Sequence, residues 1–578
     1  MLRTLSKSIR QYALAAVLSP VCMAGEVYME IRIPGILATI VDMGITAGNI
    51  TVVWQQGILL VLSALCSLIF GVGSAVFAAY AATGFSKNLR QDMYYRVQSF
   101  DFGSIDKFST ASIITRITSD VANIQMCFQM MIRMTVRCVV MTVLACIQVY
   151  QLSPKLCTVY LIVLPILALG LTLLTKLVFP IFERGFKTVD KLNNIIQENL
   201  HGIRVVKSFV RQKKEEEKFS GVSGTLYNDF SKAERIMAFN SPLMNGAVYA
   251  ALIAISYLGA QMIVISGNTT FTTGNLASMF TYTTQILSGL MMLSMVFVML
   301  TMSREPMRRC AELLQEKTEL TNPENPLMEV SDGSLEFEGV SFRYSEKADK
   351  FALDNVSVKI KAGQTVGIIG GTGSSKSTFV QLIPRLYDVT EGSIKVGGVD
   401  VRDYDIKVLR DQVAMVLQKN TLFSGTIKDN LRWGDPNATD EEMEEACRLA
   451  CAHGFIETFP DGYDTYIEQE GKNVSGGQKQ RLCIARALLK KPKILILDDS
   501  TSAVDTHTDA QIRKAFAEHI PGTTKLIIAQ RVSSVQEADL ILVLDGGKLV
   551  AQGDHETLLR ESQIYREVYE SQVKGGEE

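Results

Sequence analysis

The sequence lacks three features, and each absence excludes a class of protein. Lysine plus arginine (58) do not outnumber aspartate plus glutamate (60), giving a net charge of −2, whereas a nucleic-acid-binding protein carries a basic surplus. The ten cysteines include no C-x-x-C pair and no set of cysteines and histidines at zinc-site spacing, which indicates reduced structural thiols and no zinc site. A removable signal peptide is not expected, because the first apolar run is too long and has no small-residue cleavage site.

Long apolar runs dominate the first half of the chain. Hydrophobic residues make up 47% of the 578 residues, and the mean hydropathy of +0.17 is high for a soluble protein. Six runs before residue 305 are each long enough to cross a bilayer as a helix. They lie near residues 14–40, 56–83, 125–150, 156–180, 241–265 and 276–302. We therefore expect an all-α membrane domain of six helices over residues 1–305.

Lysine and arginine are unevenly distributed between these runs. They are frequent before the first run, between the second and third, and between the fourth and fifth, but residues 43–53 and 266–275 contain none. Basic loops remain in the cytoplasm, so both termini are expected there. The two long basic segments contain few glycines or prolines and are expected to extend the helices into the cytoplasm, turning at Ser99–Phe108 and Arg204–Gln212.

Some polar residues lie within the runs. Glu26, Glu30 and Arg32 either face a polar cavity or pair between helices, because an isolated charge in hydrocarbon is costly. Arg133 and Arg137 are placed at the inner interface, where long side chains snorkel. The sixth run mixes polar side chains with adaptable thioethers, which suits a pocket for varied ligands, although lipid-facing packing explains any single methionine equally well. These residues are Thr281, Thr283, Thr284, Gln285, Ser288, Met291, Met292, Met295 and Met299.

The composition changes after residue 305. Residues 306–332 are charged, contain Pro323 and Pro326, and are expected to form a linker. From there, short β-type runs alternate with helical stretches, which predicts an α/β domain over residues 333–578 with a mostly parallel sheet and a ligand at the carboxyl edge of its strands. The expected strands are 335–340, 356–360, 366–369, 493–498, 525–528 and 540–544.

A glycine-rich loop follows the run Val366–Ile369 and matches the phosphate-loop pattern G-x-x-x-x-G-K-[ST] at all but one position. Its backbone N–H groups are expected to cradle a polyphosphate. Lys376 is expected to reach the outer phosphates, and the Ser377 hydroxyl to hold Mg²⁺. Ser375 replaces the second glycine, and its Cβ is expected to be tolerated beside a helix start. The expected binding residues are Gly370, Gly371, Thr372, Gly373, Ser374, Ser375, Lys376, Ser377 and Thr378.

Six further motifs accompany this loop. Tyr344 could stack on an adenine, although an ordinary packed tyrosine is the alternative. Gln418 could contact Mg²⁺ and an attacking water, and Asp498 ends an apolar strand, a usual place for a carboxylate that binds Mg²⁺ through water. Gln530 follows the next strand, where a sensor of the terminal phosphate would lie. The remaining two motifs are Asn473–Gln478, which contributes Ser475, Gly476, Gly477 and Gln478, and Ser502–Asp505.

These motifs, in this order, resemble those of the ATP-binding cassette (ABC) exporter family, and the resemblance to a half-transporter covers essentially the whole chain. Val474–Gln478 resembles the LSGGQ signature, Gln418 the Q-loop glutamine, Tyr344 the adenine-stacking aromatic and Ser502–Asp505 the D-loop; the two tip segments resemble coupling helices. In this family each ATP lies between the phosphate loop of one subunit and the signature of the other. The resemblance therefore implies ATP, Mg²⁺ and a second half-transporter as partner.

Two positions depart from the family pattern at the catalytic centre. The residue after the magnesium-binding aspartate is normally glutamate, and here it is Asp499, whose carboxylate is one methylene shorter. The switch position is normally histidine, and here it is Gln530, which has no ionisable proton. With Gln418, these are the expected catalytic residues. The chain thus resembles the degenerate-site subunit of a heterodimeric bacterial multidrug exporter, and its Ser475–Gln478 would complete the site of a non-identical partner; a slow homodimer is the alternative.

The resemblance implies ATP-driven export of small hydrophobic or amphipathic compounds by alternating access, in contact with membrane lipids. The alternatives are a lipid or glycolipid flippase, and an ATP-gated conductance or regulatory membrane subunit. Few residues precede the first run, which argues against a peptidase-containing peptide exporter. Asn49 and Asn268 match glycosylation acceptors in outer loops, but the expected location is a bacterial plasma membrane, which would leave them bare.

Overall fold

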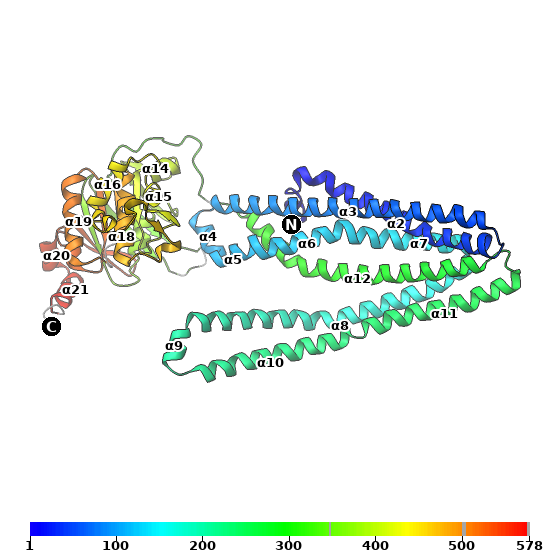
Figure 1. Ribbon diagram of the computed structural model, residues 1–578. Helices are drawn as coiled ribbons and strands as arrows, with labels where there is room; N and C mark the ends of the chain where they lie inside the picture. Colours follow the sequence, from blue (N-terminus) through cyan, green and yellow to red (C-terminus); the bar gives the residue numbers. More distant parts are fainter. Residues whose placement is uncertain (319, 346–347, 349, 500–503, 575–578) are drawn as a thin grey trace. The chain divides into compact units, whose positions relative to one another are not determined.

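The computed structural model describes residues 1–318, 320–345, 348, 350–499 and 504–574, and the chain forms two compact units (Figure 1). The first unit comprises Met1–Gln98 and Thr110–Glu316, and the second comprises Ser99–Ser109 and Lys317–Glu578.

The first unit is entirely helical in its regular structure. Its elements are α1 (Leu2–Ser6), η1 (Arg10–Tyr12), α2 (Ala13–Thr39), η2 (Ile40–Ile45), α3 (Ile50–Gln98), α5 (Thr110–Thr115), η3 (Arg116–Asp120), α6 (Val121–Met130), η4 (Met131–Thr135), α7 (Val136–Leu152), α8 (Pro154–His201), α9 (Ile203–Ser208), α10 (Gln212–Met237), α11 (Asn240–Ser266) and α12 (Thr273–Gln315). Figure 1 shows α9 joining α8 to α10 at the tip of a long helical hairpin, at the second predicted turn.

Six helical segments among the described residues are long and apolar enough to cross a membrane, which confirms the predicted number of spans. Helices suit hydrocarbon because every backbone polar group is bonded within the segment. The helix α3 contains 49 residues and at ~1.5 Å per residue is roughly 70 Å long, against a hydrocarbon core of about 30 Å. Much of it therefore lies outside hydrocarbon, as the long basic segments predicted.

The core of this unit joins α2, α7, α8, α11 and α12. Buried apolar side chains from these helices pack around Ile31 and Tyr282. Polar bonds connect the same helices: the Tyr282 hydroxyl donates to the Ile31 carbonyl (3.0 Å), and Tyr160 bonds Thr283 (2.6 Å). Buried hydrogen bonds of this kind keep the polar groups of apolar helices satisfied.

The sixth helix differs from the prediction at its end. The charged stretch after residue 305, expected to begin the linker, continues α12 to Gln315. The physical reason is amphipathicity: Met307, Cys310 and Ala311 are buried, while Glu305 and Arg308 are exposed.

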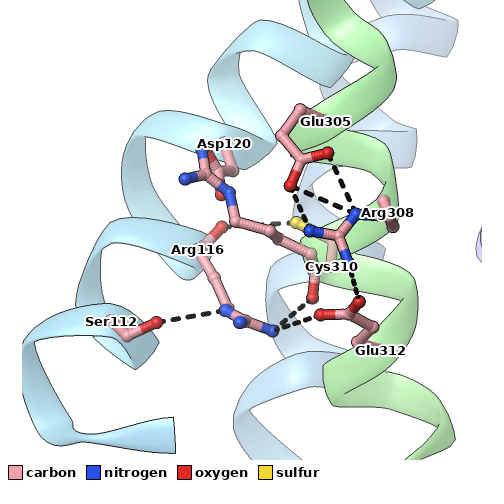
Figure 2. Close-up of polar contacts among 8 residues, drawn as sticks. Ser112, Arg116, Asp120, Glu305, Arg308, Cys310 and Glu312 are labelled. Carbon is pink, nitrogen blue, oxygen red and sulfur yellow. Dashed lines mark hydrogen bonds and ion pairs between the residues drawn. The ribbon is translucent and has the colours of Figure 1, made fainter. Parts of the chain in front are cut away.

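A polar network holds this end of α12 against η3 (Figure 2). Arg116 donates to the carbonyl of Arg309 (2.6 Å), and Arg309 donates to the buried carboxylate of Asp120 (2.7 Å). Arg116 also lies 3.6 Å from Glu312. The third and sixth spans are thus cross-linked beyond their apolar sections.

The second unit is α/β. Its strands are β1 (Leu335–Phe342), β2 (Leu353–Ile360), β3 (Thr365–Ile369), β4 (Glu391–Val396), β5 (Val399–Asp400), β6 (Val413–Val416), β7 (Gly425–Thr426), β8 (Tyr466–Ile467), β9 (Ile494–Asp498), β10 (Thr524–Ile528), β11 (Leu540–Asp545) and β12 (Lys548–Gly553). Its helices are α4 (Phe102–Phe108), α13 (Lys376–Gln381), α14 (Ile406–Gln412), α15 (Ile427–Leu431), α16 (Asp440–Leu449), α17 (His453–Glu457), η5 (Gly462–Asp464), η6 (Gln469–Gly471), α18 (Gly476–Leu489), α19 (Thr506–His519), η7 (Val532–Ser534), α20 (His555–Glu561) and α21 (Gln563–Lys574).

The main sheet has the order β12-β11-β3-β10-β9-β6 and is parallel except for its edge strand β12. This confirms the α/β fold class. The two earliest predicted strands lie elsewhere: β1 and β2 pair antiparallel in a separate sheet of order β2-β1-β4-β5. Alternate residues of the main sheet enter different cores, Ile494 and Ile496 on one face and Leu495 and Leu497 on the other. Both faces are therefore covered, as parallel sheets require.

Candidate functional site

The glycine-rich loop joins β3 to α13, as predicted. A Cβ at Gly370 would lie 2.1 Å from the carbonyl oxygen of Leu544, so only glycine fits there. Ser375 has φ +70° and ψ +26°, in the left-handed region. The structure therefore tolerates this side chain at a position where glycine would be unstrained.

Lys376 lies over the loop that precedes it. Its Nζ donates to the carbonyls of Gly370 and Gly371 (both 2.9 Å) and lies 3.4 Å from the Ser374 hydroxyl. Burial lowers the pKa of the Lys376 ammonium, and the nearby carboxylates of Asp499 and Asp498 oppose that shift. The ammonium is thus held at the mouth of the loop, beside two carboxylates.

Oxygen ligands suited to a hard cation meet at the carboxyl end of β9. The Ser377 hydroxyl donates to Asp498 (3.0 Å), the buried last residue of that strand. Burial raises the pKa of Asp498, and the adjacent Asp499 carboxylate adds to the effect. Gln418 lies after the neighbouring strand β6. A hydroxyl, a carboxylate and an amide oxygen fit Mg²⁺, which takes oxygen ligands and usually keeps further waters or phosphate oxygens.

Asp499 is the centre of the predicted catalytic group. Its Oδ2 accepts hydrogen bonds from the side-chain amides of Gln530 (2.8 Å) and Gln418 (3.5 Å). Burial raises the pKa of Asp499, while those two bonds and the charge of Lys376 lower it. The backbone of Asp499 has φ +48°. The fold thus brings together all three residues that the sequence identified as catalytic.

Tyr344 lies beside the loop helix. Its hydroxyl bonds Thr378 (2.9 Å), and its ring is half exposed, with its edge against Tyr387 at a centroid distance of 5.3 Å. Sequence reasoning missed Tyr387, which donates from its hydroxyl to Asp106 of α4 (2.8 Å) and packs on Phe102. Only the fold shows this contact, because Tyr387 and Asp106 are far apart in the chain.

The signature motif forms the start of α18. Ser475 and Gln478 make a reciprocal capping box, in which each side chain accepts from the backbone N–H of the other. Across the described part of the chain, residues 475–478 make no hydrogen bond to the phosphate loop. Of the predicted D-loop, Ser502 lies outside the described residues, and Asp505 caps α19 by accepting from the N–H of Thr508 (2.9 Å).

The first unit contains a second polar site. Arg137 donates to Glu26 (2.5 Å) and to Glu30 (2.8 Å), so the prediction that it snorkels at the interface is wrong. The prediction of pairing between helices is confirmed for Glu26 and Glu30. The reason is that α2 presents both carboxylates to the start of α7. Beside them is a cavity of about 290 Å³. Its lining includes Glu30, Arg137, Met141, Thr284, Gln285, Ser288 and Met292.

Comparisons with known proteins agree with this architecture. The family model described as "ABC transporter transmembrane region" matches residues 17–291, and the model described as "ABC transporter" matches residues 353–502. The uncharacterized ABC transporter ATP-binding protein YfiB of Bacillus subtilis is 36% identical over 564 residues, covering 98% of this chain and 97% of that protein. The uncharacterized ABC transporter ATP-binding protein Rv1273c of Mycobacterium tuberculosis is 33% identical, with 99% and 98% covered.

A solved structure shows the same fold. The ATP-bound structure of a bacterial Atm1-family ABC exporter superposes with a TM-score of 0.81 at 24% identity, covering 98% of each chain. The chain therefore belongs to the ABC transporter family: it has the fold of an exporter half-transporter, and its nucleotide-binding unit couples ATP hydrolysis to membrane transport.

Proposed function

We propose that this chain is one subunit of a heterodimeric exporter of hydrophobic or amphipathic compounds, and that its own ATP site hydrolyses poorly. It lies in a plasma membrane with both termini in the cytoplasm. Residues 1–305 carry the transport path and residues 333–578 bind the nucleotide. The observation that carries the proposal is the bond between Asp499 and Gln530 (2.8 Å), at the two positions where the family has glutamate and histidine.

The binding half of the site is complete. Lys376 leaves its loop carbonyls to bind the outer phosphates, and Ser377, Asp498 and Gln418 hold the Mg²⁺ that comes with ATP. Tyr344 exposes enough of its ring to stack on the adenine. Nothing in this group of residues prevents ATP from binding tightly.

The hydrolytic half is weak. The Asp499 carboxylate is one methylene short of the glutamate that positions the attacking water, and the same oxygen already accepts from two amides. Gln530 can donate to a γ-phosphate, but its amide does not ionise at neutral pH and so cannot act as a general acid or base. General acid–base catalysis is worth about 10²–10⁴ in rate, so ATP in this site is expected to persist through many cycles of a competent site.

The competent site is the one that this chain completes for its partner. Residues 475–478 begin α18 and are bonded within their own cap, which leaves the N–H groups of Gly476 and Gly477 at the helix start available for an incoming γ-phosphate. The signature is thus intact while the phosphate-loop side is altered. That asymmetry favours a non-identical partner over a homodimer.

The cavity beside Glu30 and Arg137 supports an amphipathic substrate. Its lining offers the charged side chains of Glu30 and Arg137 and the polar Gln285 and Ser288, together with the thioethers of Met141 and Met292. Thioethers adapt to apolar surfaces of varied shape. The buried Oε1 of Gln285 has no partner within the described residues, so it can accept a hydrogen bond from a substrate.

The first test is the subunit composition of the tagged chain purified from its native membrane, by intact mass. One copy of this chain with one different half-transporter is expected, and a homodimer would refute the proposal. The second test compares ATP hydrolysis per complex with and without the paired changes Asp499→Glu and Gln530→His. A rise is expected, and adding Lys376→Ala should abolish the gain. Unchanged hydrolysis after the paired changes would contradict the catalytic explanation.

A further inference from the structure

The last described helix, α21, reaches the loop that carries Gln530. The side-chain amide of Gln572 donates from Nε2 to the carbonyl of Gln530 (2.8 Å), and its Oε1 accepts from the N–H of Val532 (2.8 Å). One side chain thus bonds the backbone on both sides of Arg531. The sequence offered no motif in this helix.

Packing fixes the position of α21. Tyr565 is fully buried in the core that also contains Val532 and Val535, and its hydroxyl bonds His555 of the preceding helix (2.8 Å). The helix is therefore anchored at Tyr565, about two turns before Gln572. Gln572 itself is exposed, so its two hydrogen bonds rather than buried surface connect it to the loop.

The contact continues to the catalytic group. The backbone of Gln530 is held by Gln572, and its side chain donates to Asp499 (2.8 Å). The other side of the same loop is tied to α19, since Arg513 donates to the Ser533 carbonyl (3.0 Å) and Ser534 bonds Asp509 (3.1 Å). The carbonyl of Gln530 and the N–H of Val532 are bonded to Gln572 of α21.

From this geometry we infer that Gln572 is a positioning residue, which holds the switch loop so that Gln530 faces the γ-phosphate of bound ATP. The inference rests on the proposed ATP site. Gln572 touches no nucleotide; it acts by fixing the peptide groups on either side of Arg531. Without the Gln572 side chain, the Gln530 side chain is no longer held in one direction. The affinity for the terminal phosphate falls, and contacts with the rest of the nucleotide are unaffected.

The test measures ATP and ADP affinities of the full-length chain by displacement of a fluorescent nucleotide. Gln572→Met keeps the length and removes both bonds. The matched control is Gln563→Met on the same helix, where the native amide bonds Glu567 one turn away. Because a net hydrogen bond is worth a few-fold to about tenfold in an equilibrium constant, Gln572→Met should weaken ATP binding about threefold to tenfold.

ADP lacks the γ-phosphate, so its affinity should change by less than about twofold, and the control should change neither. Equal losses for ATP and ADP, or no loss for either, would overturn the inference. Lys376→Ala separates this failure from failure of the ATP site: it should remove both affinities. If Lys376→Ala leaves ATP binding intact, the proposed site is wrong and the positioning role falls with it.

Discussion

Replacing Arg137 with glutamine should destabilise the membrane unit strongly. Arg137 bonds Glu26 at 2.5 Å and Glu30 at 2.8 Å. The exposed fraction of the side chain is 27% for Arg137, 15% for Glu26 and 31% for Glu30. Without the guanidinium, two carboxylates one helical turn apart on α2 remain largely buried and repel each other. Breaking a buried ion pair by removing one partner costs about 3–5 kcal/mol.

The assay is thermal unfolding of the full-length chain in lipid nanodiscs. At about 2–4 °C per kcal/mol for a unit of this size, Arg137→Gln should lower the midpoint by roughly 6–20 °C. The matched control is Arg184→Gln, where the native arginine is 62% exposed and 3.5 Å from Asp229; exposed pairs are worth about 0–1 kcal/mol. Changing Glu26, Glu30 and Arg137 together to glutamine should recover most of the loss. Equal midpoints for the two single variants, or a triple variant worse than Arg137→Gln, would refute the ion-pair argument.

Three further predictions concern the nucleotide-binding unit. Tyr387→Phe removes the bond to Asp106 but keeps the ring, so ATP affinity should be unchanged while substrate-stimulated hydrolysis falls several-fold, measured on the same preparation. Ser375→Gly relieves the left-handed backbone and should raise stability by about 1 kcal/mol in thermal unfolding. Burial raises the pKa of Asp498 in the folded chain. Ionisation of this carboxyl therefore lowers the stability of the fold as the pH rises from the ordinary pKa of an aspartate through the higher pKa in the folded chain. Asp498→Asn should therefore raise the unfolding temperature of the nucleotide-free chain at about pH 7, less so near about pH 4, while weakening Mg²⁺-dependent ATP binding. A lower midpoint for that variant would contradict the assigned cause.

Local features were predictable from the sequence. The phosphate loop requires a buried strand, glycines and a lysine at a helix start within a few residues, and all of these are consecutive in the chain. The spans follow from apolar length alone, because hydrocarbon permits little else than helices. The position of Asp498 at the end of a strand was also predicted correctly, because a run of apolar residues followed by a carboxylate can be recognised in the sequence alone.

Contacts between distant segments were not predictable. Nothing in the residues around Arg137 indicates that α2 presents Glu26 and Glu30 to it, since each pattern is compatible with several partners. The end of α12 was not predicted, because the charged residues after 305 were interpreted as a linker. Which face of that segment is buried depends on the helices that pack against it, and the sequence does not show them. Gln572 shows the limit most clearly: its helix has no motif, and its role comes from the loop on which it lies.

Two of the departures from the family pattern share a backbone conformation, and two are joined by a hydrogen bond. Ser375 and Asp499 both have positive φ, at +70° and +48°, and aspartate tolerates that region better than most non-glycine residues do. Asp499 and Gln530 are also partners, because the amide of one donates to the carboxylate of the other. Gln530→His alone removes the amide that donates to the Asp499 carboxylate. Asp499→Glu alone lengthens the side chain and so moves the carboxylate relative to that amide. The two positions therefore behave as one unit, and their combined exchange should differ from the sum of the single exchanges, as expected for residues in direct contact.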